Sequence, residues 1–208
     1  VITEFQPLRY DEVLGDWSWE KESRSKMEVP APESLKVATH NVLKTTTWAM
    51  EWIIRSPERF EKEMEELQKL DADVIGLNEV TVPFLTLLQS QTWVRDQYYI
   101  SDVINSDGET SRNGTINFQK TEMGNVLLSR YPIKLLRTFK VSSKTRLPRD
   151  SILATLFDND TVFCSSHITA YESKSKIREI QMHELAEALP EANVVIMGDL
   201  NLHLVSES

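Results

Sequence analysis

The sequence predicts an α/β fold in which two mixed β-sheets pack face to face and helices cover their outer sides. Two observations lead to this prediction. Strand-like apolar runs alternate with segments of helical period at 35–90 and again at 172–197. Between these regions lies a long insert of short strand-like runs that are separated by turn residues. Strands set between helices, together with a strand-rich insert, indicate layered sheets with helices outside.

Composition bounds the class of protein. The chain has 208 residues, of which 40% are hydrophobic and 26% charged, which is typical of one globular domain. Its single cysteine excludes an intrachain disulfide framework and a cysteine-based zinc cage. A formal net charge of −9 argues against broad, charge-driven binding to nucleic acid, but carboxylates that hold a divalent cation also make a chain acidic. We expect an intracellular protein, cytoplasmic or nuclear.

The first 34 residues differ from the rest of the chain. They carry Trp17, Trp19 and many charges without a clean period, and they include the breakers Pro30 and Pro32. We expect an irregular N-terminal arm over 1–34 whose aromatic side chains pack on the body, followed by one domain over 35–208.

Regular elements begin at residue 35. The segment 35–39 alternates apolar and polar residues as a half-buried strand does. Residues 57–70 are predicted to form a helix, because Ser56 and Pro57 suit its start and apolar residues recur at helical spacing. Those apolar residues are Phe60, Met64, Leu67 and Leu70. A nearly all-apolar run at 73–77 is typical of a strand buried on both faces, and 81–90 is predicted as a second helix.

The second half of the chain is richer in strands. We predict strands at 98–101, 114–118, 125–129, 134–142, 151–157 and 161–165. A helix over 172–188 follows, with Ile177, Ile180, Leu185 and Leu189 expected on its packed side. The apolar run 194–197 is the last predicted strand.

Four segments place polar residues at the end of an apolar strand. They are 37–41, 74–79, 162–167 and 194–201, and they end in Asn, Asn-Glu, His and Asp-Leu-Asn. In α/β folds, ligands bind beyond the carboxyl ends of the strands. One such ending is most simply a polar residue that closes a strand, but four together predict a single polar site.

The five side chains form a chemically coherent set. Glu79 is a hard oxygen ligand that suits Mg²⁺ or Mn²⁺. Asp199 can orient or deprotonate a water molecule, whereas Asn41, Asn201 and His167 can hydrogen-bond phosphoryl oxygens. This inventory suits metal-assisted attack of water on a phosphate ester. The sequence has no serine nucleophile elbow, no Walker glycine loop and no dinucleotide fingerprint.

Several motifs resemble those of the endonuclease/exonuclease/phosphatase (DNase I-like) superfamily. They are Thr39-His-Asn-Val42, Asp73-Val-Ile-Gly-Leu-Asn-Glu-Val80, Gly124-Asn-Val-Leu-Leu-Ser-Arg-Tyr-Pro-Ile133, Ser166-His-Ile168, Gly198-Asp-Leu-Asn201 and the pair Arg178 and Gln181. The matches run in the family's order over about residues 35–202, and the tyrosyl-DNA phosphodiesterase-like branch is the nearest in character. The resemblance implies a four-layer α/β sandwich.

The resemblance also implies roles for these residues. Glu79 resembles the family's metal-binding glutamate and Asn41 its partner at the metal–phosphate site. Asp199 and Asn201 resemble the pair that positions the attacking water, and His167 resembles the histidine that contacts the scissile phosphate.

Two further residues are assigned to substrate binding. Arg149 precedes a strand from which it can reach a phosphate, although a solvated loop position is the simpler interpretation, and Asn125 opens the predicted strand 125–129.

The sequence departs from the family at three places. His40 stands where an aromatic residue is usual, and Asn78 stands where Gln is usual. The family's terminal Ser-Asp-His segment is absent, so we expect the last strands to be missing and residues 1–208 to be a poor or inactive catalyst.

The function expected from the resemblance is a Mg²⁺- or Mn²⁺-dependent phosphodiesterase acting on a nucleic-acid-type phosphodiester, such as DNA or RNA ends. Two alternatives stay open. One is a hydrolase of the sphingomyelinase or inositol-phosphatase kind, and the other is an inactive binding module on the same fold. The substrate pocket lies in loops such as 102–123, which carry no readable motif.

Overall fold

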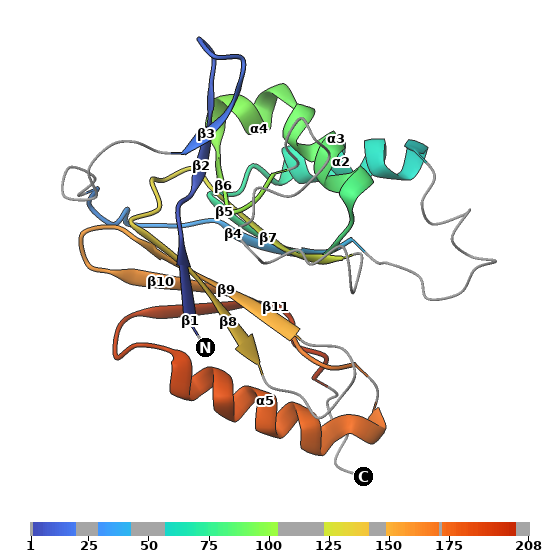
Figure 1. Cartoon of the computed structure of the whole chain (residues 1–208), viewed down its shortest axis with the longest axis vertical. Helices are drawn as coiled ribbons and strands as arrows, with labels where there is room; N and C mark the ends of the chain where they lie inside the picture. Colours follow the sequence, from blue (N-terminus) through green and yellow to red (C-terminus); the bar gives the residue numbers. More distant parts are fainter. Residues whose placement is uncertain are drawn as a thin grey trace.

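The computed structural model describes residues 2–19, 29–42, 57–103, 123–141, 149–170 and 172–202. Figure 1 shows four layers from top to bottom: helices α2–α4, a six-stranded sheet, a five-stranded sheet and helix α5. Both sheets are mixed, because each contains one parallel pair beside antiparallel pairs. The predicted α/β fold with two sheets packed face to face is therefore confirmed.

The upper sheet has the strand order β3-β2-β6-β7-β5-β4. Its strands are β3 (Asp16–Trp19), β2 (Leu8–Asp11), β6 (Tyr99–Ile100), β7 (Gly124–Ser129), β5 (Val74–Val80) and β4 (Val37–Asn41). Three helices cover its outer side: α2 (Pro57–Leu70), α3 (Val82–Ser90) and α4 (Thr92–Gln97). Among the described neighbouring strands of this sheet, only the pair β4 and β5 is parallel.

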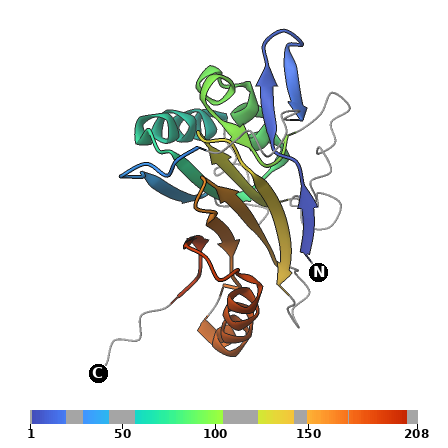
Figure 2. The same cartoon turned by 90° about the vertical axis from the view of Figure 1, so that its left-hand side faces the viewer.

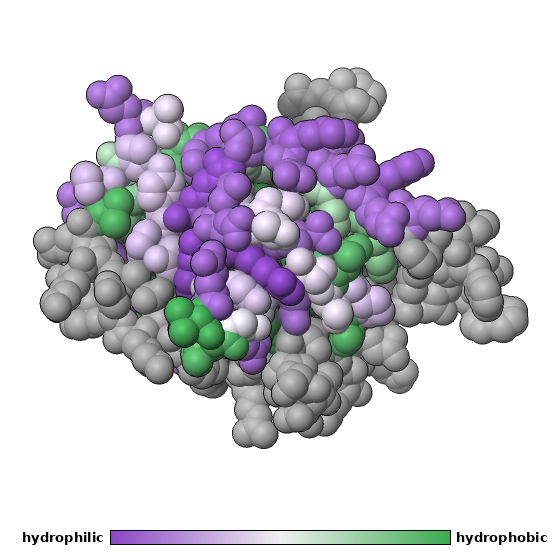
Figure 3. Space-filling model, turned by 90° about the horizontal axis from the view of Figure 1, so that it is seen from above, coloured by the Kyte–Doolittle hydropathy of each residue, from purple (hydrophilic) through white to green (hydrophobic). Residues whose placement is uncertain are grey.

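Helix α2 packs through the face that its sequence period predicts. Phe60, Met64 and Leu67 are buried at helical spacing, and Phe60 meets Phe84 of α3 edge to face. Leu70 at the end of the helix is 40% exposed, because the helix ends there. Seen from above in Figure 3, the outside of this helical layer is largely hydrophilic with scattered apolar spots, as expected of a solvated face.

The lower sheet has the order β1-β8-β9-β10-β11. Its strands are β1 (Ile2–Phe5), β8 (Leu135–Val141), β9 (Arg149–Leu156), β10 (Thr161–His167) and β11 (Val194–Asp199). Helix α5 (Ser175–Ala188), preceded by the 3₁₀ turn η2 (Glu172–Lys174), lies below this sheet in Figures 1 and 2. Strands β10 and β11 form its parallel pair.

The two sheets approach each other closely at Gly76 of β5. A Cβ at this position would lie 2.8 Å from Ser165 Oγ and 3.1 Å from Met197 Sδ, both in the lower sheet. Glycine therefore lets β5 lie directly against β10 and β11. This contact matters for function, because these strands and their neighbour β4 carry the predicted site residues at their ends.

The N-terminal segment differs from the irregular arm expected from the sequence. Residues 2–19 form β1, which pairs with β8 in the lower sheet, and the β2–β3 hairpin at one edge of the upper sheet. Its aromatic packing is as expected for Trp17, which meets Tyr10 edge to face and packs against the upper core. These strands are short and charged, so they show no clear alternation of apolar and polar residues. The partner of β1 is β8, which lies far along the chain, so the pairing cannot be seen in the local sequence.

Two other expectations also need comment. The packed side of α5 is formed by Arg178, Gln181 and Leu185, whereas Ile180 is 47% exposed. The prediction of Ile180 on that side was wrong, because two polar residues occupy the buried face. The predicted strand 114–118 lies outside the described residues. Among the described helices, none is long and apolar enough to cross a membrane.

Candidate active site

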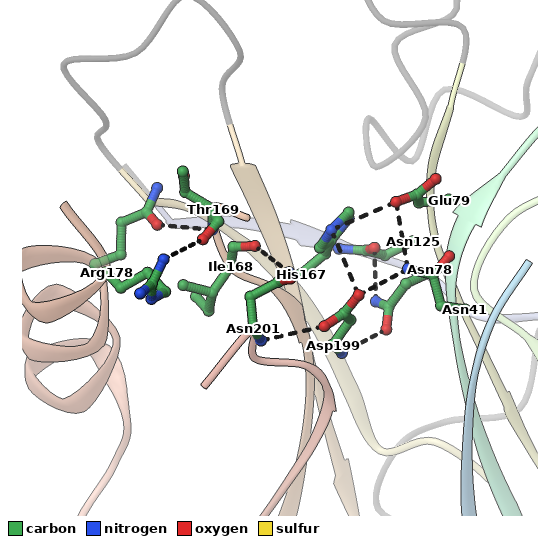
Figure 4. Close-up of polar contacts among 11 residues, drawn as sticks. Asn41, Asn78, Glu79, Asn125, His167, Ile168, Thr169, Arg178, Asp199 and Asn201 are labelled. Carbon is green, nitrogen blue, oxygen red and sulfur yellow. Dashed lines mark hydrogen bonds and ion pairs between the residues drawn. The ribbon is translucent and has the colours of Figure 1, made fainter. Parts of the chain in front are cut away.

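Parallel pairing brings the predicted site residues to one end of the sandwich. In the upper sheet Asn41, the last residue of β4, lies opposite Asn78 of β5. In the lower sheet His167, the last residue of β10, lies opposite Asp199, the last residue of β11. Because parallel strands end on the same side, both pairs present their side chains at neighbouring carboxyl ends, as Figure 4 shows.

Asn41 joins the two carboxylates of the site. Its Nδ2 donates a hydrogen bond to Asp199 Oδ2 at 2.8 Å and a longer one to Glu79 Oε1 at 3.3 Å (Figure 4). Hydrogen bonds to ionised groups are about twice as strong as neutral ones. One amide group thus holds acidic side chains from two different sheets close together.

His167 completes this group. Its Nε2 lies 3.6 Å from Glu79 Oε1 and 3.9 Å from Asp199 Oδ2. The exposed fraction of the side chain rises from 8% for His167 to 15% for Glu79 and 33% for Asp199. His167 is therefore the most buried of the three side chains, and Asp199 is the most exposed.

A β-bulge aims Glu79 at the site. The pairing of β5 with β7 shifts register between Leu77 and Val80. Asn78 and Glu79 therefore lie together opposite a single residue, Asn125. Glu79 has φ 56°, in the left-handed region that a non-glycine residue rarely adopts. Bulges and strained backbone both concentrate at active sites, where they redirect a side chain.

The turn after β11 places Asp199 and Asn201. Gly198 has φ 126°, and a Cβ there would lie 1.9 Å from the carbonyl oxygen of Ser166, so only glycine fits. Asn201 has φ 48°, which asparagine tolerates better than most residues. Its backbone N–H donates to Asp199 Oδ1 at 3.1 Å, and its Nδ2 donates to the carbonyl oxygen of Ile168 at 2.9 Å.

Two buried side chains of α5 hold the segment that follows His167. Gln181 Oε1 accepts a hydrogen bond from the Thr169 N–H at 3.0 Å, and Arg178 donates to the Thr169 carbonyl oxygen at 3.4 Å. Gln181 is 0% exposed and Arg178 6%. The motif that pairs Arg178 with Gln181 in the sequence therefore fixes the chain directly beyond the site histidine.

Asn125 and Arg149, the two residues assigned to substrate binding, lie differently. Asn125 is only 5% exposed, and its Oδ1 accepts a hydrogen bond from Asn78 Nδ2 at 2.8 Å. Arg149 opens β9 opposite Val141, and its side chain lies outside the described part of the chain.

Cys164 and His183 also carry reactive side chains, but they lie away from the site. Cys164 is fully buried in the core between the lower sheet and α5, where burial raises the pKa of its thiol to about 12. His183 lies on the exposed side of α5, 3.2 Å from Glu187.

The role of Asn78 was missed in the sequence, although its position is implied there. The β5 residues Val74 and Gly76 face the lower sheet, so alternation places the side chain of Asn78 on the same face. Asn78 is 0% exposed, and its Oδ1 accepts a hydrogen bond from the backbone N–H of Asp199 at 2.9 Å (Figure 4). The alternation identifies its face, but the contact with Asp199 requires the packing of the two sheets.

The donor set suits a hard divalent cation. Within the described ranges, no group of three or more His, Cys, Asp and Glu side chains is arranged to hold a metal ion by itself. Glu79 could supply one carboxylate, and the amide oxygen of Asn41 could be the second protein donor. Ions such as Mg²⁺ are commonly held by one or two carboxylates, substrate phosphate and several waters rather than by a protein cage. The residues present fit that mode of binding.

Several solved structures share the fold of this chain. A search of curated proteins finds no match. Among solved structures, humanized D. rerio TDP2 with 14 mutations is 18% identical, with a TM-score of 0.55, and the alignment covers 82% of this chain and 67% of that chain. TDP2 from C. elegans is 14% identical, with a TM-score of 0.54, 81% of this chain aligned and 48% of that chain.

A mannosyl-6-phosphatase from Bacteroides thetaiotaomicron gives a TM-score of 0.59 at 16% identity, covering 84% of this chain and 68% of that chain. At these identities the similarity concerns the fold, and this chain spans about half the length of the C. elegans protein. The sequence itself matches the model of the Endonuclease/Exonuclease/phosphatase family over residues 38–207, the stretch that contains every residue of the candidate site. The chain is a member of the Endonuclease/Exonuclease/phosphatase family.

Proposed function

We propose that this protein is a Mg²⁺- or Mn²⁺-dependent phosphodiesterase that cleaves a nucleic-acid-type phosphodiester by attack of water on phosphorus. One observation carries the proposal. Asn41, Glu79, His167 and Asp199 come from four strands in two sheets, and their side chains contact one another within 2.8–3.9 Å. A structural role does not require two carboxylates, an amide and an imidazole at the joint end of both sheets.

The cation would be held by Glu79 and by the amide oxygen of Asn41. When bound, it would polarise the phosphoryl group and offset the developing negative charge, which an acidic chain of net charge −9 cannot do with its overall field. The Asn41 amide nitrogen donates to both Glu79 and Asp199, so Glu79 would hold the cation while the second carboxylate, Asp199, would serve a different task.

Asp199 would orient the attacking water and accept its proton. A new oxygen–phosphorus bond forms as the bond to the leaving oxygen breaks, and the proton from the water passes to Asp199. The Asp199 carboxylate is fixed through both oxygens, by Asn201 N–H and by Asn41 Nδ2, so little reorganisation is needed. His167 and Asn201 would donate to the phosphoryl oxygens, where charge accumulates in the transition state.

Comparison with similar folds supports the choice of substrate class. One solved structure with this fold is D. rerio TDP2 complexed with single strand DNA product. A DNA or RNA end is therefore the first candidate, and an intracellular location, cytoplasmic or nuclear, is consistent with it. The similar mannosyl-6-phosphatase fold favours a phosphomonoester as the second candidate, in the same group as inositol phosphates. The shared fold alone does not decide between them.

The test is a hydrolysis panel with the protein in Mg²⁺, in Mn²⁺ and in EDTA. The substrates are 5′-tyrosyl DNA, abasic DNA, sphingomyelin, inositol phosphates and mannose 6-phosphate. Any turnover of a nucleic-acid substrate, however slow, should be abolished by EDTA and by Glu79→Gln, whereas the exposed Glu61→Gln on α2 should leave it unchanged.

Turnover that survives Glu79→Gln would refute the proposed site. Tight binding of 5′-tyrosyl DNA without turnover in either metal would indicate instead a binding module. Preference for mannose 6-phosphate or an inositol phosphate would indicate the phosphatase alternative.

A further inference from the structure

A pair of buried amides lies beneath the site, between the two sheets. Asn78 is 0% exposed and Asn125 is 5% exposed, yet Asn78 hydrogen-bonds directly to the backbone of Asp199. Building on the proposed function, we infer that Asn78, oriented by Asn125, is a positioning residue that fixes the backbone of Asp199 without touching substrate.

The polarity of the contacts explains why Asn78 is an amide. Asn78 Oδ1 must accept from the Asp199 N–H at 2.9 Å, while Asn78 Nδ2 donates to Asn125 Oδ1 at 2.8 Å. A single side chain of this length therefore needs an acceptor at one end and a donor at the other. Aspartate lacks the donor and leucine lacks both groups. Because the backbone N–H of Asp199 can only donate, the Asn78 atom that faces it must be the amide oxygen.

Asn78 controls both acidic residues of the site. Its side chain reaches across to β11 and fixes Asp199, and its backbone forms the bulge that turns the next residue, Glu79, toward the site. The separation between the metal-binding carboxylate and the water-orienting carboxylate therefore depends on one dipeptide. A shift of a fraction of an ångström in such a separation lowers catalytic rate without removing any reacting group.

The other bonds of Asp199 do not replace this one. Its side-chain oxygens accept from Asn41 and Asn201, and its carbonyl oxygen accepts from the Ile168 N–H. Those partners lie at the end of the strands, whereas Asn78 lies in the interior between the sheets. Loss of the Asn78 bond would remove the contact that ties the Asp199 backbone to the upper sheet and allow the end of β11 to move.

The first measurement is independent of activity. In ¹⁵N-labelled, metal-free protein, hydrogen exchange of the Asp199 amide should accelerate at least about tenfold in Asn78→Ala, and it should also accelerate in Asn125→Ala. Ser165→Ala is the matched control, because Ser165 is also buried between the sheets and its Oγ has no hydrogen-bond partner within the described part of the chain. Unchanged exchange in Asn78→Ala would overturn the inference, whether or not the protein hydrolyses any substrate.

The second measurement separates positioning from substrate binding. With bis(p-nitrophenyl) phosphate and Mn²⁺, we expect Asn78→Ala to lower kcat about 10–100-fold with KM changed less than about twofold, as for other residues behind a metal site. Asn78→Gln keeps the donor and the acceptor and should recover part of kcat, whereas Asn78→Asp should not. Asn78→Ala/Asn125→Ala should be no slower than Asn78→Ala, since both act through one contact.

The two measurements distinguish a failure of the positioning role from a failure of the proposed function. An equal loss in kcat for Ser165→Ala, or a loss confined to KM, would overturn the positioning role. Absence of turnover by the unsubstituted chain would count against the proposed function alone, because the exchange of the Asp199 amide is measured without substrate.

Discussion

Asn41 Nδ2 lies 2.8 Å from Asp199 Oδ2, although the two residues are 158 positions apart and belong to different sheets. β4 and β11 are the edge strands of the two sheets, and this bond joins their ends. The same nitrogen also contacts Glu79 Oε1. Partial positive charge is thereby placed between two carboxylates that would otherwise repel each other.

Replacing that amide by a carboxylate should destabilise the fold. Asn41→Asp removes two hydrogen bonds to charged groups and adds a third negative charge, so we expect a loss of about 2–3 kcal/mol in the free energy of unfolding. Mg²⁺ at millimolar concentration should restore part of it, because a ligand of the folded state stabilises by mass action. Urea unfolding with and without Mg²⁺ measures both effects. Asn193→Asp, at an exposed loop position, should show neither, and equal losses in the two variants would contradict the prediction.

Glu79 should be replaceable without cost to stability but not to function. Glu79→Gly relieves a left-handed φ and removes a charge, so the protein should be unchanged or more stable by up to about 1 kcal/mol. Glu79→Gln retains the strained backbone and should leave stability within about 0.5 kcal/mol. Both should lower metal-dependent turnover at least about 100-fold. A destabilisation of several kcal/mol in either variant would show that Glu79 is a structural residue.

The two glycines at the interface of the strands should differ in their tolerance. Gly198→Ala drives a Cβ into the Ser166 backbone and should cost more than about 4 kcal/mol. Gly76→Ala meets only the ends of Ser165 and Met197, which can shift, so about 1–3 kcal/mol is expected. Ser165→Ala should recover part of the Gly76→Ala loss, since it removes the nearest atom. Thermal unfolding of the set tests this order, and additive effects of Gly76→Ala and Ser165→Ala would count against it.

The Cys164 thiol should not react with labelling reagents in the native protein. It should also make the free energy of unfolding fall as the pH rises above 9. Its pKa is raised to about 12 in the folded state, so above pH 9 the unfolded chain loses the proton while the folded chain keeps it. Stability should therefore fall as pH rises from 9 toward 12, by at most about 1.4 kcal/mol per pH unit from this group. Cys164→Ala should lack that component of the slope. Rapid labelling of the native thiol at pH 8 would contradict the prediction.

Gln181 should support the chain beyond His167. Gln181→Leu leaves the Thr169 N–H buried without its acceptor, so a loss of about 1–3 kcal/mol is expected. Turnover should also fall, because the residues that follow the site histidine lose their anchor. Ile180→Ala, at the neighbouring position that is 47% exposed, serves as the control and should cost less than about 1 kcal/mol. Equal effects of the two substitutions would argue against the anchoring role.

The sequence by itself determined the layered α/β class and the polar residues that follow the apolar runs of the site. Helix α2 begins at Pro57 and buries Phe60, Met64 and Leu67, because the 3.6-residue period is a local property of the chain. The short apolar runs that end in Asn41, Glu79, His167 and Asp199 were also readable, since a buried strand and the polar residue that closes it are adjacent in sequence.

Only the tertiary structure decided the rest, because register and packing are set by partners distant in the chain. No local period shows that β1 pairs with β8, or that Arg178 and Gln181 occupy the buried face of α5. The bulge at Glu79 arises from pairing with β7, and Asn78 reaches Asp199 only because Gly76 lets the two sheets approach. The residues of the site can thus be identified from the sequence, whereas their geometry is fixed by the packing of the two sheets.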